Sequence, residues 1–264
     1  MISYFRTPTL ALWLCAMIWG VGFVPQKMAM AYIDPLLFNA LRSALPVGAL
    51  GLLICVRRSL STSKSRLFTP SELRVGAGLG IWLWLALGAQ QVGIVHTFVY
   101  RASLITGIYI IFVPFVTFLL FSMPIASWQL SVVGLACLGL FLLITNSQGL
   151  DIGVGDLWIL LGAVFWAIHV GVVARNKNQG RVLQLSFMQM AICAVLSAVS
   201  SMLLHESWCM SDIIAAQWFL LYAGLISGCV AFSLQIYGQR AVTPLMAAII
   251  LIFEAVFGAC LGWW

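Results

Sequence analysis

Nine apolar segments, most of them about 20 residues long and separated by short polar connections, make up almost the whole chain. A helix needs roughly 20 apolar residues to cross the hydrocarbon core of a bilayer, so each segment is long enough to span a membrane. We expect spans at 9–31, 35–56, 73–95, 99–121, 128–145, 156–174, 183–204, 215–238 and 244–263. The sequence therefore predicts an all-α, polytopic helical membrane protein with no room for a soluble domain.

The composition supports this class and excludes others. With 63% hydrophobic and 8% charged residues, the chain lacks the polar surface that a water-soluble globule needs. The first apolar run continues from Thr9 to Met28 without a small-residue cleavage site, which favours a retained helix over a signal peptide. Six of the seven cysteines fall inside apolar runs and none forms a CxxC or Cys/His cluster, so we expect no disulfide framework, no metal site and no cofactor.

The distribution of charge predicts the orientation. A cytoplasmic N-terminus places ten of the 13 lysines and arginines on the cytoplasmic side, as the positive-inside rule requires. These ten are Arg6, Arg57, Arg58, Lys64, Arg66, Arg74, Arg175, Lys177, Arg181 and Arg240. The net charge of +6 is thus explained by topology and does not call for an anionic partner such as a nucleic acid.

Faint internal similarity relates the first five segments to the rest. The stretch 12–22 resembles 159–169, with Trp19 matching Trp166, and Gln90 and Gly93 match Gln235 and Gly238. Because five is an odd number of helices, the two copies must be inverted in the membrane. We therefore expect one repeat at 1–147 and a second at 148–264, with a substrate site near the midplane between them, as in secondary transporters.

Several motifs, in this order along the chain, resemble those of one known family. They are Trp19-Gly20, Asp34-Pro35 followed by Arg42, ASLITGIYIIFVPF at 102–115, Gly155-Asp156-Leu157 leading to Phe165–His169, LQIYGQR at 234–240, and TPLMAAIILIFEAVFGACLGWW at 243–264. Each is degenerate alone, but their order and spacing resemble the ten-helix EamA-type carriers of the drug/metabolite transporter superfamily over essentially the whole chain.

The resemblance implies a bacterial inner-membrane carrier, commonly an exporter of amino acids or related metabolites. The expected partners are a small-molecule substrate and the lipid bilayer, and a homodimer stays open. In the family pattern a short turn and a tenth helix follow a region like Gly262-Trp263-Trp264, where the printed sequence ends. Nine spans are therefore visible, and the tenth helix is missing from the second repeat.

Glu254 is the principal candidate for binding substrate. It stands ten residues into the last segment, and at about 1.5 Å per residue it lies roughly 15 Å deep, near the midplane. A carboxylate at that depth is costly unless it is protonated, paired or facing water. It either binds an amino group of the substrate or titrates during transport, or it is a structural carboxylic acid bonded to a neighbouring helix.

Aromatic rings are expected at the same depth. Trp19 and Trp166 each stand ten residues into their segments, away from the interfaces where tryptophan usually lies, and Tyr109 is similarly deep. Such rings stack on a flat or cationic substrate, although filling space between helices explains them as well.

Three further polar residues complete the candidate site. His169, one turn from Trp166, is a candidate for proton coupling or a neutral hydrogen-bonding group. Arg42 is too deep to reach the interface, and pairs with Glu254, holds backbone carbonyls or meets a substrate carboxylate. Gln90, like its match Gln235, is a gate or rim group or an interhelical hydrogen-bonding residue.

Competing functions fit less well. An enzyme is not expected, because no HExxH motif or catalytic triad can be assembled from three histidines and seven acids. The alternative to a carrier is a channel or a non-transporting membrane scaffold, but a channel favours repeated polar positions along its pore, and the spans here carry scattered single polar groups.

Overall fold

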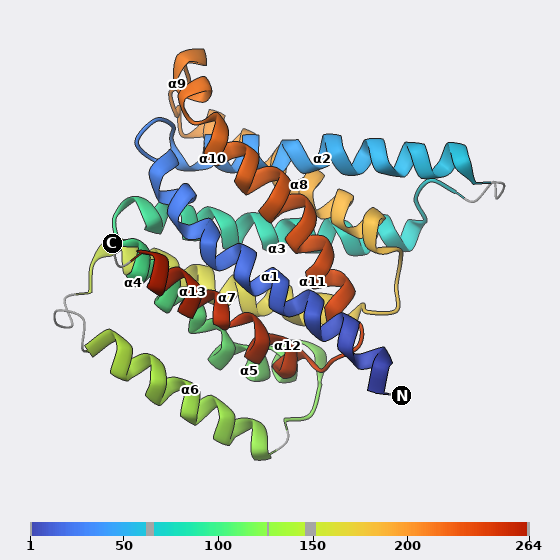
Figure 1. The fold of residues 1–264 in the computed structure, drawn as a ribbon, viewed down its shortest axis with the longest axis vertical. Helices are drawn as coiled ribbons and strands as arrows, with labels where there is room; N and C mark the ends of the chain where they lie inside the picture. Colours follow the sequence, from blue (N-terminus) through green and yellow to red (C-terminus); the bar gives the residue numbers. More distant parts are fainter. Residues whose placement is uncertain (1, 62–65, 126, 146–151, 263–264) are drawn as a thin grey trace.

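A computed structural model describes residues 2–61, 66–125, 127–145 and 152–262. Within these residues the protein is all-helical (Figure 1). The helices are α1 (Ile2–Ala29), α2 (Pro35–Leu60), α3 (Pro70–Val95), α4 (Val99–Gly107), α5 (Tyr109–Phe121), α6 (Ser127–Thr145), α7 (Val154–Arg175), α8 (Val182–Leu203), α9 (Met210–Ala215), α10 (Gln217–Leu221), the π-helix η1 (Tyr222–Ala231), α11 (Phe232–Gln239), α12 (Pro244–Leu251) and α13 (Phe253–Gly262).

Eight stretches of the described chain are long and apolar enough to cross a membrane. They are Thr7–Ala29, Pro35–Leu60, Pro70–Val95, Val99–Phe121, Val154–Arg175, Val182–Leu203, Gln217–Gln239 and Pro244–Gly262. The fifth expected span, 128–145, is the helix α6 and is not among these eight. The predicted polytopic helical membrane protein is confirmed, whereas the expected repeat boundary at 147/148 lies outside the described residues.

The outer surface of the bundle is apolar. Large side chains such as Leu52, Leu119 and Val195 are exposed on α2, α5 and α8. A water-soluble protein rarely exposes so much contiguous apolar surface, whereas lipid tails cover it without cost. The buried side chains between the helices form the core instead.

The helices pack as two crossed groups around a common centre. In Figure 1, α1 and α11 cross in front of α3 and α7, while α2 and α8 lie together along one edge. The core is closed by contacts of α3 with α7 and α8, of α2 with η1, and of α1 with α13. The helix α6 lies at the opposite edge, against α4 and α5.

Two glycines allow close helix approach at corresponding places. A Cβ atom on Gly93 of α3 would clash with Ile159 and would lie 2.6 Å from the carbonyl oxygen of Gly155, both in α7. A Cβ atom on Gly238 of α11 would lie 2.6 Å from Cγ of Leu12 in α1 and 2.8 Å from the carbonyl oxygen of Pro8. The two α1 residues precede their α7 counterparts by 147 positions, so the α3–α7 and α11–α1 interfaces use equivalent residues.

Two expected spans are interrupted where the sequence predicts continuous helices. The segment 99–121 changes pitch at Ile108, and the segment 244–263 does so at Ile252, 144 positions later. At each place a 3₁₀-type backbone hydrogen bond tightens the helix. The bonds run from Ile111 N to Ile108 O (2.9 Å) and from Ala255 N to Ile252 O (2.8 Å). The expected span 215–238 also differs, because residues 222–231 form the wider π-helix η1.

An ion pair and two hydrogen bonds connect the helices at one end of the bundle. Arg101 at the start of α4 forms an ion pair of 2.6 Å with Asp156 at the start of α7. Glu206, which follows α8, accepts bonds from the backbone N–H groups of Leu36 and Leu37 at 3.0 and 2.7 Å. A carboxylate at this position satisfies free amides of the first turn of α2 and complements the helix dipole.

Candidate functional site

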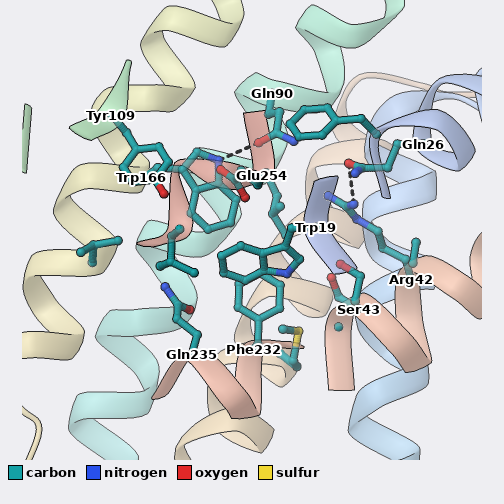
Figure 2. A pocket seen from close by; sticks show the side chains of 18 residues that line it. Trp19, Gln26, Arg42, Ser43, Gln90, Tyr109, Trp166, Phe232, Gln235 and Glu254 are labelled. Atoms are coloured by element: carbon teal, nitrogen blue, oxygen red, sulfur yellow. Dashed lines mark hydrogen bonds between the residues drawn. The ribbon is translucent and has the colours of Figure 1, made fainter. Parts of the chain in front are cut away.

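A cavity lies at the centre of the bundle, where α1, α3, α7 and η1 meet the interrupted helices. Six of the seven predicted site residues line it, namely Trp19, Arg42, Gln90, Tyr109, Trp166 and Glu254. Figure 2 shows these side chains converging from different helices on one space. Its volume is about 40 Å³, room for about three waters at the ~10–15 Å³ that each requires. A metabolite therefore fits only if the helices move apart.

Three aromatic rings form one wall. The ring of Trp19 lies 5.7 Å from that of Trp166 and 4.8 Å from that of Phe232, measured between ring centroids. Trp166 and Phe232 are stacked, with 6.0 Å between centroids and 14° between planes. The midplane tryptophans predicted from the sequence thus meet in space, together with Phe232, which the sequence did not single out.

Trp166 is fixed by a polar bond across the cavity. Its Nε1 atom donates a hydrogen bond of 2.7 Å to Oε1 of Gln90 (dashed in Figure 2). A buried indole N–H usually has such a partner, because an unpaired one costs desolvation energy. The bond links α7 to α3 beside the Gly93 contact.

Glu254 presents its carboxyl group to the cavity. The residue is 5% exposed and has no hydrogen-bond partner among the described residues. It stands near the start of α13, 145 positions after Tyr109 at the start of α5. The same spacing separates Gln90 from Gln235, so the two interrupted helices bring corresponding positions to the cavity. The phenol oxygen of buried Tyr109 has no partner within the described chain either.

Arg42 lies at one end of the cavity. Its hydrogen-bond partner is not one of the two protein partners predicted for it, Glu254 and backbone carbonyls. Its Nη1 atom donates a 2.8 Å hydrogen bond to Oε1 of Gln26, and its guanidinium lies 5.1 Å from the ring centre of Phe38. The described chain therefore shows no pairing with Glu254 and no bond to a backbone carbonyl. Nε and Nη2 of Arg42 have no partner in the described part, which leaves donors for a ligand carboxylate.

His169 does not line the cavity, although the sequence places it on the same helix face as Trp166. It is fully buried and lies 3.1 Å from Oε1 of Gln189 through Nε2. Its ring meets that of Trp166 edge-on, with 5.8 Å between centroids. His169 therefore packs against the Trp166 ring outside the cavity lining and does not face a substrate.

Twelve of the 18 residues that line the cavity were not among the predicted site residues. Among them are Gln26, Ser43, Phe232 and Gln235. Gln235 carried a signal, because it matches Gln90 in the second half of the chain. Gln26 lies one turn after Gly22 and bonds its carbonyl (3.0 Å), a position that looks like the end of a span in the sequence.

The cavity offers hydrogen-bonding and aromatic groups, and no metal-binding geometry. Within the described residues, no group of three or more histidines, cysteines, aspartates or glutamates is placed to hold a metal ion. The arrangement can bind a small polar molecule by stacking, by a carboxyl group and by a guanidinium.

Comparisons with known proteins agree with a membrane transporter. An uncharacterized transporter of Archaeoglobus fulgidus is 25% identical over 252 residues, covering 94% of this chain and 74% of that protein. The uncharacterized transporter YoaV of Bacillus subtilis is 27% identical over 268 residues, covering 94% of this chain and 84% of that protein. A solved crystal structure matches with a TM-score of 0.57 at 16% identity, covering 97% of this chain and 98% of the other, which supports the fold alone.

The second half of the chain carries the family signature. The profile of the EamA-like transporter family matches residues 153–264, the part that contains Trp166, the π-helix and Glu254. The chain is a multi-pass membrane transporter, and its residues 153–264 are similar to the EamA-like transporter family.

Proposed function

We propose that this transporter is a secondary carrier, acting as an exporter, for small metabolites with an amino group, such as amino acids or related amines. The observation that carries the proposal is the carboxyl group of Glu254, which is buried, faces the cavity and has no partner among the described residues. A lone carboxylate in a membrane interior is stabilised by a cation, and a substrate ammonium group supplies one.

The other cavity groups suit the same substrates. The rings of Trp19, Trp166 and Phe232 form a wall on which a flat or cationic group can stack. The free Nε and Nη2 donors of Arg42 suit a carboxylate, because guanidinium and carboxylate form strong charge-assisted bonds. A zwitterionic amino acid satisfies both ends of the cavity.

Transport follows if the two inverted halves move around this site. The cavity holds only about three waters in this state, so a loaded state requires the helices to separate on one side at a time. The pitch changes at Ile108 and Ile252 and the π-helix η1 are places where the backbone departs from regular α-helix, and they suit such bending. We place the carrier in the inner membrane, as the family resemblance implies, and its N-terminus in the cytoplasm, as the charge distribution indicates.

The test is binding followed by transport. Purified protein is screened for thermal stabilisation against amino acids and amines, because a ligand that binds the folded state raises its melting temperature. A stabilising compound is then tested for saturable counterflow in proteoliposomes, which a channel or scaffold does not show. We expect Glu254→Gln to abolish both signals.

A matched control is Glu206→Gln, which changes a carboxylate outside the cavity. We expect it to leave ligand binding intact while lowering stability. Full transport by a folded Glu254→Gln protein would contradict the role of Glu254, and non-saturable flux would contradict the carrier.

A further inference from the structure

The cavity contains two Trp–Gln pairs. One pair is joined by a hydrogen bond, and the polar side-chain atoms of the other have no hydrogen-bond partner within the described chain. Trp166 donates to Gln90. Among the described residues, no hydrogen-bond partner exists for the indole Nε1 of Trp19 or for either amide atom of Gln235. Both residues are buried, Trp19 with 9% of its surface exposed and Gln235 completely. Both residues line the same cavity.

The two Trp–Gln sets occupy equivalent positions in equivalent helix interfaces. In α3 and α11, each glutamine stands three residues before the glycine that touches the opposite helix, Gly93 or Gly238. Gly93 contacts Ile159 of α7, and Trp166 follows Ile159 by seven residues. Gly238 contacts Leu12 of α1, and Trp19 follows Leu12 by seven residues. The backbone therefore offers Trp19 and Gln235 the same relationship that Trp166 and Gln90 have.

The difference lies in the orientation of the Trp19 ring. In the view of Figure 2 the indole of Trp19 lies between Gln235 and Arg42, with Nε1 on the Arg42 side and the carbon edge toward Gln235. Rotating the ring about the Cβ–Cγ bond directs Nε1 toward the amide of Gln235. A rotation of this ring is therefore the first change that a bond from Trp19 to Gln235 requires.

We propose that the two Trp–Gln pairs alternate during transport, so that the bond from Trp19 to Gln235 forms in the opposite-facing state as the bond from Trp166 to Gln90 opens. This inference rests on the proposed alternating-access function. Gln90 and Gln235 are then positioning residues that hold one indole at a time and release the other to the substrate.

The exchange gives a carrier a physical advantage. A ligand can shift a two-state equilibrium only by its differential affinity, so a carrier works best when its two empty states have similar populations. Forming the same bond in each state keeps their energies similar. An interaction present in one state only would hold the carrier there.

Indole N–H resonances test the exchange directly, without a known substrate. Protein labelled with ¹⁵N-tryptophan is examined in nanodiscs, and the Trp19 and Trp166 signals are assigned from Trp19→Phe and Trp166→Phe. A hydrogen-bonded indole proton resonates downfield of an unbonded one. We expect Gln90→Leu to move the Trp19 signal downfield, although the substitution lies beside Trp166, and to raise the population of the bonded Trp19 form about tenfold.

The reciprocal substitution has the opposite sign. Gln235→Leu is expected to leave Trp19 unbonded and to hold the Trp166 signal in its downfield position. The control is Gln239→Leu, which removes another buried and unpartnered amide one turn along α11 but outside the cavity lining. It is expected to move neither signal. If Gln90→Leu fails to fold, Trp166→Phe removes only the donor and carries the same expectation for Trp19.

The outcomes separate this inference from the proposed function. A Trp19 signal unmoved by both Gln90→Leu and Trp166→Phe overturns the exchange, even if transport is observed. Reciprocal shifts in a protein that shows no saturable transport support the exchange and overturn the carrier.

Discussion

Arg181 donates hydrogen bonds from Nε and Nη2 to the two carboxylate oxygens of Glu72, over 2.8 and 2.9 Å. The bonds join the start of α3 to the start of α8, and Glu72 is buried beneath them. Glu72 also accepts a bond from the backbone N–H of Thr69, which completes a capping box on α3. One carboxylate therefore fastens a helix cap and an interhelical ion pair.

Removing that carboxylate is expected to destabilise the bundle. Glu72→Ala leaves a cationic partner unpaired and frees the first turn of α3, at a cost of about 2 kcal/mol or more. We expect the melting temperature in detergent to fall by roughly 4–10 °C. The control Arg74→Gln alters an exposed side chain two residues along α3, and an equal fall in both variants would contradict the role of the ion pair.

The close approach at Gly93 predicts a second stability effect. Gly93→Ala introduces a Cβ atom that collides with Ile159 and the Gly155 carbonyl, so α3 and α7 must separate at a cost of about 1–3 kcal/mol. Gly78 is in the same helix, and a Cβ atom there meets nothing within 4 Å. Gly78→Ala should be neutral or stabilising by up to about 1 kcal/mol, because alanine favours helix. Thermal unfolding of the two variants measures the difference, and similar melting temperatures would refute the packing argument.

Arg42 is predicted to select substrates that carry a carboxylate. Arg42→Gln should weaken transport of an amino acid roughly 10- to 100-fold, because a charge-assisted bond is lost. The corresponding amine without a carboxylate should be affected much less. Competition of the two compounds in proteoliposomes measures the ratio. An equal loss for both would assign Arg42 a structural role only, through Gln26 and Phe38.

Any dependence of transport on a pH gradient is predicted to reside in Glu254 and not in His169. Glu254 faces the cavity and meets water when the cavity opens, whereas His169 is enclosed by Trp166, Gln189 and Phe232. A folded His169→Gln protein should keep the gradient dependence of the parent, whereas Glu254→Gln, which is expected to abolish transport, should show no gradient-driven uptake. Vesicle uptake with and without an imposed gradient decides between them, and the reverse pattern would reinstate His169 as the proton carrier.

The lengths and positions of the spans could be predicted because a bilayer imposes them. The expected segment 156–174 corresponds to α7 (Val154–Arg175), and 35–56 corresponds to α2 (Pro35–Leu60). The pitch changes at Ile108 and Ile252 and the π-helix η1 were not predictable in the same way. They change which backbone atoms are bonded without changing how apolar the segment is, so hydropathy contains no signal for them.

Counting residues along each span grouped side chains that line one cavity, but rotation about each helix axis was only partly predictable. Counting residues placed Trp19, Trp166 and Glu254 at one level, and all three line the cavity. The same count placed His169 beside Trp166, yet it points to α8 and Gln189. Which side of a helix faces the cavity depends on its neighbours, and the pairing of Arg42 with Gln26 across two helices has no pattern along the chain.

The matched interfaces at Gly93 and Gly238 have a consequence for genetics. In a library that varies every position under selection for activity, the tolerance profile at Gly93 should resemble that at Gly238, and Gly155 and Ile159 should resemble Pro8 and Leu12. An allele that enlarges one interface should be suppressed by a smaller residue across that interface and not across the other. The two interfaces would then behave in a suppressor screen as two independent sets of compensating positions with matching substitution patterns.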